Sequence, residues 1–568
     1  CSAPPAPVGP AAAGPRRITI VATTDLHGHV EALPVLAGYI DNLRAERPGT
    51  LVVDSGDMFQ GTLESNLGEG DAVVAAYAAI GYAAAAIGNH EFDFGPVGPS
   101  AVADAPGDDP RGALKARAAE APFPLLMSNV VDAESGRPPA WPNVVATALV
   151  SAGGVRVGLV GATSEDTPVT TMPANFAGLR VEPIAPALAR AASDLRARGA
   201  EVVVALVHAG GACRRFDDPD DLSSCDAEAE IFSVARALPP GLVDAIAAGH
   251  THGAIAHRVA GIPIVQAYAY GRAFSRLDLD VTDGGVTAHI APPHELCVEV
   301  DDCTYEGRPV RPSAAVEAAI APAVRRAAAV RARPVGVDVV EPIQRAYAAE
   351  SALGNLFADL MREYAGTDVA LTNGGGLRAD LPAGPLTYGA LYEAMPFDNR
   401  FAIVRLRARD LARVIADNLR GKRGILSVSG VRAIAACGAG GLDVSLVRDG
   451  EPVDPDAPLT VATSDFLATG GDGGLFRNLG LPPDAIELRG DPTIRDAMAE
   501  RLRARGGRLA PADVFDPARP RIGLPSPRPV RCGAQAADAG AAARSGESSG
   551  GRPHRRPGRH AVGARRRR

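Results

Sequence analysis

The feature that most constrains this chain is a series of five short clusters of Asp, Asn and His, each closing a predicted buried strand. In chain order they read TTDLHGH, DSGDMFQG, IGNHEFDFG, VHAGG and GHTHG. The strands, such as 201–208, alternate with Ala-rich helical stretches such as 186–199, which indicates an α/β layered sheet with reactive groups at its strand ends. A lone His at a strand end is usually a core residue, but five such clusters in succession predict a metal centre.

The residue types in these clusters fit a pair of divalent cations. Such a pair, typically about 3.5–4 Å apart, needs a bridging carboxylate and further N or O ligands. Asp25 and His27 are two positions apart, as are His250 and His252, so each pair can point to one side of an extended segment. The clusters hold no cysteine, which argues against a purely structural zinc site. The candidate ligands are Asp25, His27, Asp57, Asn89, His208, His250 and His252. Of the other candidates, we assign structural roles to Asp54 and His29, and surface positions to His257 and His294.

The second half of the chain holds three segments rich in turn residues: NGGGLR at 373–378, PFDN at 396–399 and SDFLATGGDGG at 464–474. Glycine lets the backbone approach a ligand closely, although a Gly-rich turn is more often just a turn. Aromatic residues make up only 4% of the chain. Phe397 and Phe466 in these loops therefore favour stacking on a ligand, with hydrophobic packing under a loop as the alternative.

The ordered set DLH, GD, GNHEFD, VH and GHTH resembles the calcineurin-like metallophosphoesterases. With NGGGLRADLPAG, MPFDN and DFLATGGDG included, the chain from about residue 16 to 523 is similar to the bacterial and animal 5'-nucleotidase family. The resemblance implies an α/β fold, in which a four-layer metallophosphoesterase sandwich is joined by a helical linker to a C-terminal mixed α/β domain. It also implies that a water activated by two metals hydrolyses phosphate monoesters of nucleotides.

The same resemblance implies roles for the matching residues of the first half. The metals would be bridged by Asp57 and held by two sets of ligands, Asp25, His27 and His252 for one and Asn89, His208 and His250 for the other. His90, oriented by Asp93 and next to Asn89, would stabilise charge on the phosphoryl group or protonate the leaving oxygen. Ligands of these types suit Zn, Mn and Co comparably, so the cofactors are two divalent ions of any of these kinds.

In the second half the resemblance implies a nucleotide site. Phe397 and Phe466 would sandwich the base, and such stacking accepts any base. Asp472 would contact the ribose hydroxyls. Further contacts to the nucleotide are implied for Asn373, Arg378, Asn399 and Gly430. Tyr347 stands where family members commonly carry an arginine, with Arg345 nearby.

Two other kinds of function fit the same residues. The metal set could serve a 2',3'-cyclic-nucleotide phosphodiesterase, a UDP-sugar hydrolase or a related sulfur-ester hydrolase, and the phenylalanine pair favours nucleosides over inorganic sulfur substrates. A non-catalytic anchored protein that binds nucleotides is the other alternative, against which the complete metal set counts.

Length and composition predict several domains in the 568 residues. We expect a tether over 1–15, a catalytic domain over 16–310, a helical linker over 311–334, a substrate-binding domain over 335–523 and a disordered basic tail over 524–568. The tail is rich in Pro, Arg, Gly, Ala and Ser, which cannot bury a core. The net charge of −8 argues against a general nucleic-acid binder.

The cysteines are typical of an exported protein. Cys1 lies where bacterial lipoproteins are processed, which predicts a lipid anchor on Cys1 and a place in the bacterial cell envelope. Cys213 with Cys225, and Cys297 with Cys303, could each close a short disulfide loop. Cys437 and Cys532 have no partner nearby in the sequence. We assign Cys437 as a buried or free thiol and Cys532 as a residue of the tail.

Overall fold

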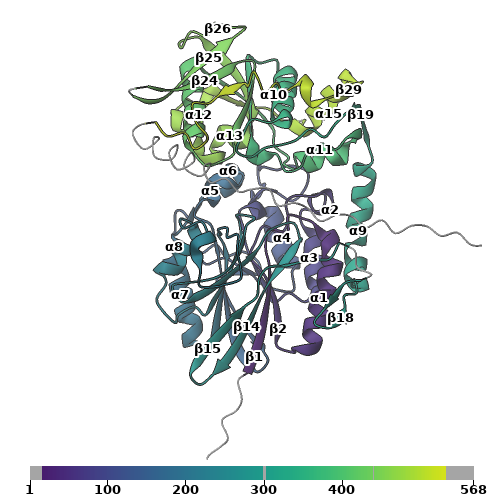
Figure 1. Cartoon of the computed structure of the whole chain (residues 1–568), viewed down its shortest axis with the longest axis vertical. Helices are drawn as coiled ribbons and strands as arrows, with labels where there is room; N and C mark the ends of the chain where they lie inside the picture. Colours follow the sequence, from purple (N-terminus) through teal and green to yellow (C-terminus); the bar gives the residue numbers. More distant parts are fainter. Residues whose placement is uncertain (1–15, 299–301, 439, 491, 533–568) are drawn as a thin grey trace, which may run out of the picture.

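The computed structural model describes residues 16–298, 302–438, 440–490 and 492–532. The predicted tether with Cys1, and residues 533–568 of the predicted tail, lie outside these ranges. In Figure 1 the N-terminal half (purple to teal) and the C-terminal half (green to yellow) stand one above the other. They are joined by α9 (Ala314–Arg331), which lies within the range predicted as a helical linker.

Two β-sheets packed face to face form the centre of the N-terminal half. The first sheet consists, in order, of β15 (Gly285–Ile290), β14 (Ala273–Thr282), β1 (Arg16–Thr23), β2 (Thr50–Asp54), β3 (Ala84–Ala86), β4 (Leu125–Leu126) and β6 (Val144–Val145). The second consists of β12 (Ala254–Val259), β13 (Ile262–Ala267), β11 (Ala245–Ala248), β10 (Val202–His208), β8 (Val155–Thr163) and β7 (Thr147–Ala152). Buried side chains of both sheets, such as Ile20 and Val204, fill the space between them.

Helices cover the outer face of each sheet. The first sheet packs against α1 (Leu33–Glu46), α3 (Asp71–Ile80) and α4 (Gly112–Glu120), and the second against α7 (Ile184–Ala197) and α8 (Glu230–Ala237). One layer of helices, the two sheets and a second layer of helices make up the four-layer sandwich. The predicted fold of this half is therefore confirmed.

Strand direction brings the five clusters together. β1, β2 and β3 run parallel to one another, as do β8, β10 and β11. The carboxyl ends of parallel strands meet at one edge of a sheet, where ligands of α/β proteins bind. The chain enters β1 at the end of the molecule far from the C-terminal half (Figure 1), so this edge faces that half.

The C-terminal half is built on a five-stranded sheet of mixed direction. Its strands, in order, are β23 (Leu426–Ser429), β20 (Val369–Asn373), β27 (Pro458–Ser464), β22 (Phe401–Arg407) and β28 (Ile486–Leu488). One face packs against α10 (Ala352–Ala365), α11 (Tyr388–Ala394) and α15 (Ile494–Arg505), and the other against α12 (Ala408–Arg420) and the hairpin of β24 (Arg432–Gly438) and β25 (Gly441–Arg448). The helix α10 begins where the Ser351 hydroxyl accepts the Gly354 amide and ends at Gly366, with φ 67°. This is the mixed α/β domain that the sequence predicts.

The end of the C-terminal half differs from the sequence prediction. The expected disulfides Cys213–Cys225 and Cys297–Cys303 are present, but Cys437 and Cys532 form a third, so their assignment as unpaired was wrong. Disorder from residue 524 is also wrong for residues 524–532. Val530 is buried in the core of this half, and the Arg528 side chain donates to the Asn418 and Arg423 carbonyls. A segment poor in apolar residues can still be ordered when a disulfide and hydrogen bonds connect it to distant parts of the chain.

Two further observations concern the surface. His257, predicted to be exposed, is fully buried on β12, where its ring packs near Phe216 beneath the loop closed by Cys213–Cys225.

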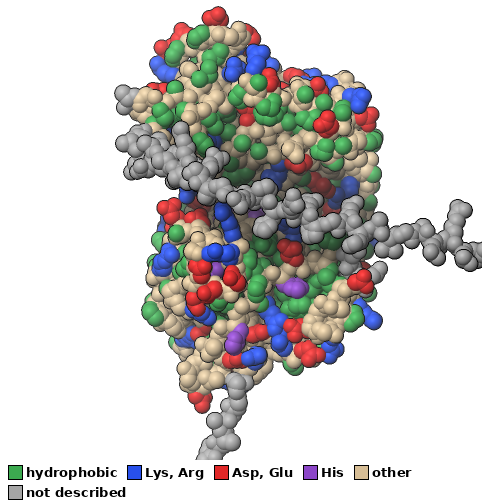
Figure 2. Space-filling view, in the orientation of Figure 1, with side chains coloured by type: hydrophobic (Ala, Val, Ile, Leu, Met, Phe, Trp, Pro, Cys, Tyr) green, Lys and Arg blue, Asp and Glu red, His purple; other side chains and the backbone are tan. Residues whose placement is uncertain are grey.

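On the face shown in Figure 2, acidic and basic side chains are interspersed over both halves. Within the described ranges, no helix has the length and apolar character needed to cross a bilayer.

Candidate active site

Five of the seven predicted metal ligands lie at strained backbone positions in loops that follow the strands. Left-handed φ is uncommon outside glycine, and it costs of order 1–3 kcal/mol per residue where structure enforces it. Among the seven predicted ligands it occurs at Asp25 (50°), His27 (49°), Asp57 (59°), His250 (76°) and His252 (55°). Gly56 has φ 97°, and a Cβ there would lie 2.8 Å from His208 Nδ1, so only glycine permits the close turn before Asp57. Strain of this kind is typical of a functional site.

The predicted ligands converge into overlapping groups whose ligand atoms all lie within 4.8 Å of one another. One group consists of Asp25, His27 and His252, a second of Asp57, His208 and His250, and a third of His27, Asp57 and His90. Asn89 joins the second group, because its Oδ1 lies 3.1 Å from His208 Nε2. Asp57 belongs to two of the groups and so lies where a bridging ligand is expected.

The donor set fits a pair of divalent cations. The Nε2 atoms of His27 and His252 are 3.0 Å apart, and His208 Nε2 is 3.0 Å from Asp57 Oδ2. His27 Nδ1 donates to the Gln60 carbonyl at 2.8 Å, and His208 Nδ1 to the Ser55 carbonyl at 2.8 Å. These backbone contacts fix the tautomer that leaves a lone pair on each Nε2, as histidine metal ligands require. Nitrogen and oxygen donors without thiolate suit Zn, Mn or Co.

Burial and the contact between Asp57 and His208 set the charge states of this cluster. Burial opposes both shifts, yet Asp57 raises the pKa of His208 to about 10 and His208 lowers the pKa of Asp57 well below its usual range. Burial raises the pKa of Asp25 to about 7, and it lowers the pKa of His250 to about 3. Burial also lowers the pKa of His27 and His252 well below the usual range. Neutral imidazole is the form that binds metals, and a desolvated carboxylate is stabilised by a nearby cation. His27, His250 and His252 are therefore in the neutral form that binds a cation, whereas His208 must lose the proton that Asp57 stabilises.

Glu91, which the sequence analysis did not single out, organises the loop that carries Asp57. Its carboxylate accepts the amides of Asp57 at 2.9 Å, Met58 at 2.7 Å and Gly88 at 2.7 Å. It is buried, so these bonds replace its hydration. The signal was present in the motif GNHEFD, where Glu91 separates the predicted catalytic residues.

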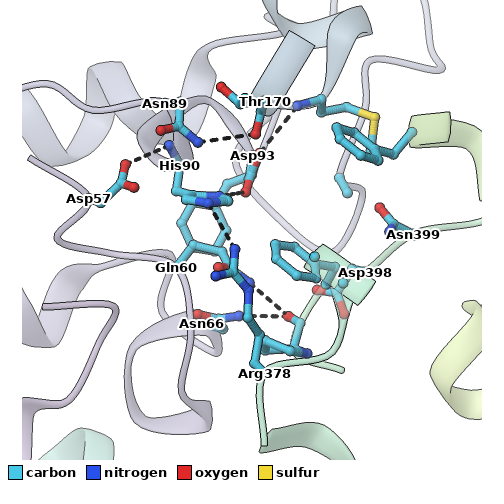
Figure 3. A pocket seen from close by; sticks show the side chains of 18 of the residues that line it. Asp57, Gln60, Asn66, Asn89, His90, Asp93, Thr170, Arg378, Asp398 and Asn399 are labelled. Carbon is cyan, nitrogen blue, oxygen red and sulfur yellow. Dashed lines mark hydrogen bonds and ion pairs between the residues drawn. The ribbon is translucent and has the colours of Figure 1, made fainter. Parts of the chain in front are cut away.

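His90 and Asp93 form the expected pair (Figure 3). His90 Nδ1 donates to Asp93 Oδ2 at 2.5 Å, and Arg378 of the C-terminal half donates to His90 Nε2 at 3.2 Å. The other carboxylate oxygen of Asp93 accepts the Thr171 hydroxyl at 2.8 Å. The imidazole is thus held in one orientation, with Nε2 directed at the cavity between the two halves.

A cavity of about 1100 Å³ lies between the halves and reaches both sets of predicted residues. From the N-terminal half its lining includes Asp57, Asn89, His90, Asp93, His250 and His252. From the C-terminal half it includes Asn373, Arg378, Phe397, Asn399, Phe466 and Asp472. At least one member of each metal group, and six of the seven predicted nucleotide residues, therefore face one space.

Phe397 and Arg378 of the C-terminal half lie close to His90. The Phe397 ring centroid lies 5.8 Å from that of His90, and the Arg378 guanidinium lies 5.2 Å from the Phe397 centroid. Asn373 donates to Asp472 at 3.3 Å. Burial raises the pKa of Asp472, and Arg423 opposes that rise. The Phe397 ring therefore lies beside both His90 and Arg378.

Two points differ from the sequence expectation. Gly430 does not line the cavity: it follows β23, and a Cβ there would lie 2.1 Å from the Asp368 carbonyl. The glycine packed against the turn of Asn373 is instead Gly424, where a Cβ would lie 2.5 Å from the Gly375 amide. The neighbouring Arg423, not foreseen, lines the cavity and donates to Asp166 of the N-terminal half at 2.8 Å. No pattern in the sequence marks it, because its partner is 257 residues away.

Fold and site together define a metal-dependent phosphoester hydrolase. Residues 18–254 match the family model of the calcineurin-like phosphoesterases, and residues 334–479 match that of the 5'-nucleotidase C-terminal domain. With both domains in this order, the chain belongs to the 5'-nucleotidase family, whose members hydrolyse nucleotide phosphoesters.

Individual relatives agree with this assignment. Protein UshA of Yersinia enterocolitica is 26% identical over 80% of this chain and 86% of its own length. Endonuclease YhcR of Bacillus subtilis is 27% identical over 82% of this chain, which spans 38% of that longer protein. Among solved structures, the 5'-nucleotidase precursor of Thermus thermophilus matches with a TM-score of 0.71 and 25% identity, over 90% of this chain and 100% of that one.

Proposed function

We propose that this chain releases phosphate from nucleoside 5'-monophosphates. The observation that carries the proposal is the shared cavity, which is lined by members of the metal groups and in which the His90 and Phe397 ring centroids are 5.8 Å apart. A nucleoside stacked on Phe397 would keep its 5' side within reach of His90 and Asp57. Six of the seven predicted nucleotide residues line this cavity.

The proposed metal ligands are Asp25, His27, Asp57, Asn89, His208, His250 and His252. When bound, the two cations would supply the charge that activates water and neutralises phosphoryl oxygens. The side chains of the chain would orient the substrate. Arg378, now 3.2 Å from His90 Nε2, would turn to the phosphate oxygens and leave Nε2 free to face them. Asp93 would hold the His90 ring in place as it stabilises charge or donates a proton.

The proposed location is outside the cytoplasm. Three disulfides among the described residues fit an oxidising compartment. A relative that is 28% identical over 56% of this chain is a cell wall protein of Listeria monocytogenes. The lipid anchor predicted at Cys1 falls outside the described residues and stays a prediction.

The test is a product analysis on AMP, a 2',3'-cyclic nucleotide and a UDP-sugar in parallel, with Mn or Zn added. We expect AMP to yield adenosine and phosphate with the highest kcat/KM. Preference for the cyclic or sugar substrate would replace the proposed substrate and keep the metal site. Tight AMP binding without products from any of the three would favour a non-catalytic binding protein.

A further inference from the structure

One backbone carbonyl links the two halves beside the base site. The Pro396 carbonyl, immediately before Phe397, accepts Gln60 Nε2 at 3.1 Å and Asn66 Nδ2 at 3.1 Å (Figure 3). Both donors belong to the N-terminal half, while Pro396 belongs to the C-terminal half. Neither amide took part in the sequence predictions.

Gln60 lies next to the metal groups. It is 3% exposed, and its own carbonyl accepts His27 Nδ1 at 2.8 Å. A single residue therefore contacts a predicted metal ligand through its backbone and the Phe397 segment through its side chain. Asn66, at the end of α2 (Leu63–Asn66), fixes the same loop, because its Oδ1 accepts the Gly61 amide at 2.8 Å.

The Phe397 segment is equally well held from its own side. The buried Arg495 donates from one nitrogen, Nη1, to the carbonyls of Met395 and Phe397, at 3.1 Å each. The carbonyls of Met395, Pro396 and Phe397 thus all accept hydrogen bonds. The donor to Met395 and Phe397 belongs to the C-terminal half, and the donors to Pro396 belong to the N-terminal half. Arg495 holds the segment on its own side, so the two amides of the N-terminal half contribute directly to how Phe397 lies relative to His90.

We propose that Gln60 and Asn66 are positioning residues that set the Phe397 ring against the metal groups through the Pro396 carbonyl. The inference rests on the proposed function, in which Phe397 stacks on the base. It predicts that these amides act on substrates that carry a base. A phosphate ester without a nucleobase does not use the Phe397 ring for stacking and depends on the pair far less.

The experiment compares AMP with 4-nitrophenyl phosphate in Gln60→Ala, Asn66→Asp and the double variant. Asn66→Asp keeps the acceptor for the Gly61 amide and replaces the donor to Pro396 by a carboxylate oxygen, which repels the Pro396 carbonyl. Loss of a buried hydrogen bond changes an equilibrium by about tenfold, so we expect kcat/KM for AMP to fall about tenfold in each single variant. The loss for 4-nitrophenyl phosphate should be at least fivefold smaller, and bound metal per chain should match the wild type.

Equal losses on both substrates, or lost metal, would overturn the inference, because Gln60 would then act on the metal site through His27. Unchanged AMP kinetics in both single variants would overturn it as well. Failure of the proposed function would look different: the wild-type protein would hydrolyse 4-nitrophenyl phosphate but not AMP.

Discussion

Replacement of Asp57 by asparagine should lower kcat/KM for AMP by about 10³-fold or more, because it removes the only carboxylate shared by two of the ligand groups. Asp57 Oδ2 lies 3.0 Å from His208 Nε2 and 3.8 Å from His27 Nε2. Asparagine has nearly the same shape and tolerates the positive φ of this position, so the fold should persist. Metal affinity should fall by more than about 100-fold, beyond the usual effect of residues that only orient a ligand. Metal analysis after dialysis measures it.

Asp54→Asn is the matched control for this change. Asp54 ends the strand that precedes Asp57 and is equally buried, but its oxygens accept the Thr23 and Tyr77 hydroxyls and the Gly56 amide. A hydroxyl can accept a hydrogen bond as well as donate one, so Thr23 and Tyr77 can accept from the amide group of an asparagine at this position. We expect this variant to retain both metals. If Asp57→Asn kept two metals and wild-type turnover, Asp57 would not be a ligand.

Replacement of His90 by alanine should lower kcat for AMP by about 10²- to 10⁴-fold, the usual contribution of a positioned acid or base. The reason is geometric. Asp93 holds the ring through Nδ1, and Nε2 faces the cavity toward Arg378. Steady-state kinetics at saturating AMP, with metal content measured in the same samples, separates this role from metal binding.

His29→Ala is the control, because His29 lies just beyond the metal loop and its side chain pairs with Glu31. It should leave turnover unchanged. Wild-type turnover in His90→Ala with metals intact would remove His90 from the chemistry. A loss of bound metal in His90→Ala would instead make His90 a ligand, since it lies in a group with His27 and Asp57.

The convergence of the proposed metal ligands was predictable, because the strands that fix them are close to them in sequence. Asp25 follows β1, Asp57 follows β2 and His208 ends β10, and parallel pairing within each sheet brings the strand ends to one edge. The helix α10 is likewise determined by local sequence, because it carries its own cap at Ser351 and its own stop at Gly366.

Contacts between residues that are far apart in the sequence were not predictable. Cys437 and Cys532 are 95 residues apart, and nothing near either cysteine indicates the other. Gly430 was chosen by motif, whereas the glycine that touches the Asn373 turn is Gly424, before the strand rather than after it. The role of Gln60 was not predictable either, because its side chain contacts the Pro396 carbonyl, which belongs to the other half of the chain.

The central claim, metal-dependent hydrolysis of nucleotides in the cavity between the halves, is tested most directly by metal reconstitution. Chelator-treated protein is titrated with Mn²⁺ while phosphate release from AMP is followed. We predict no release before addition and a rise that saturates at two equivalents per chain. Full activity in the chelated protein, or no release from AMP at any metal concentration, would contradict the account.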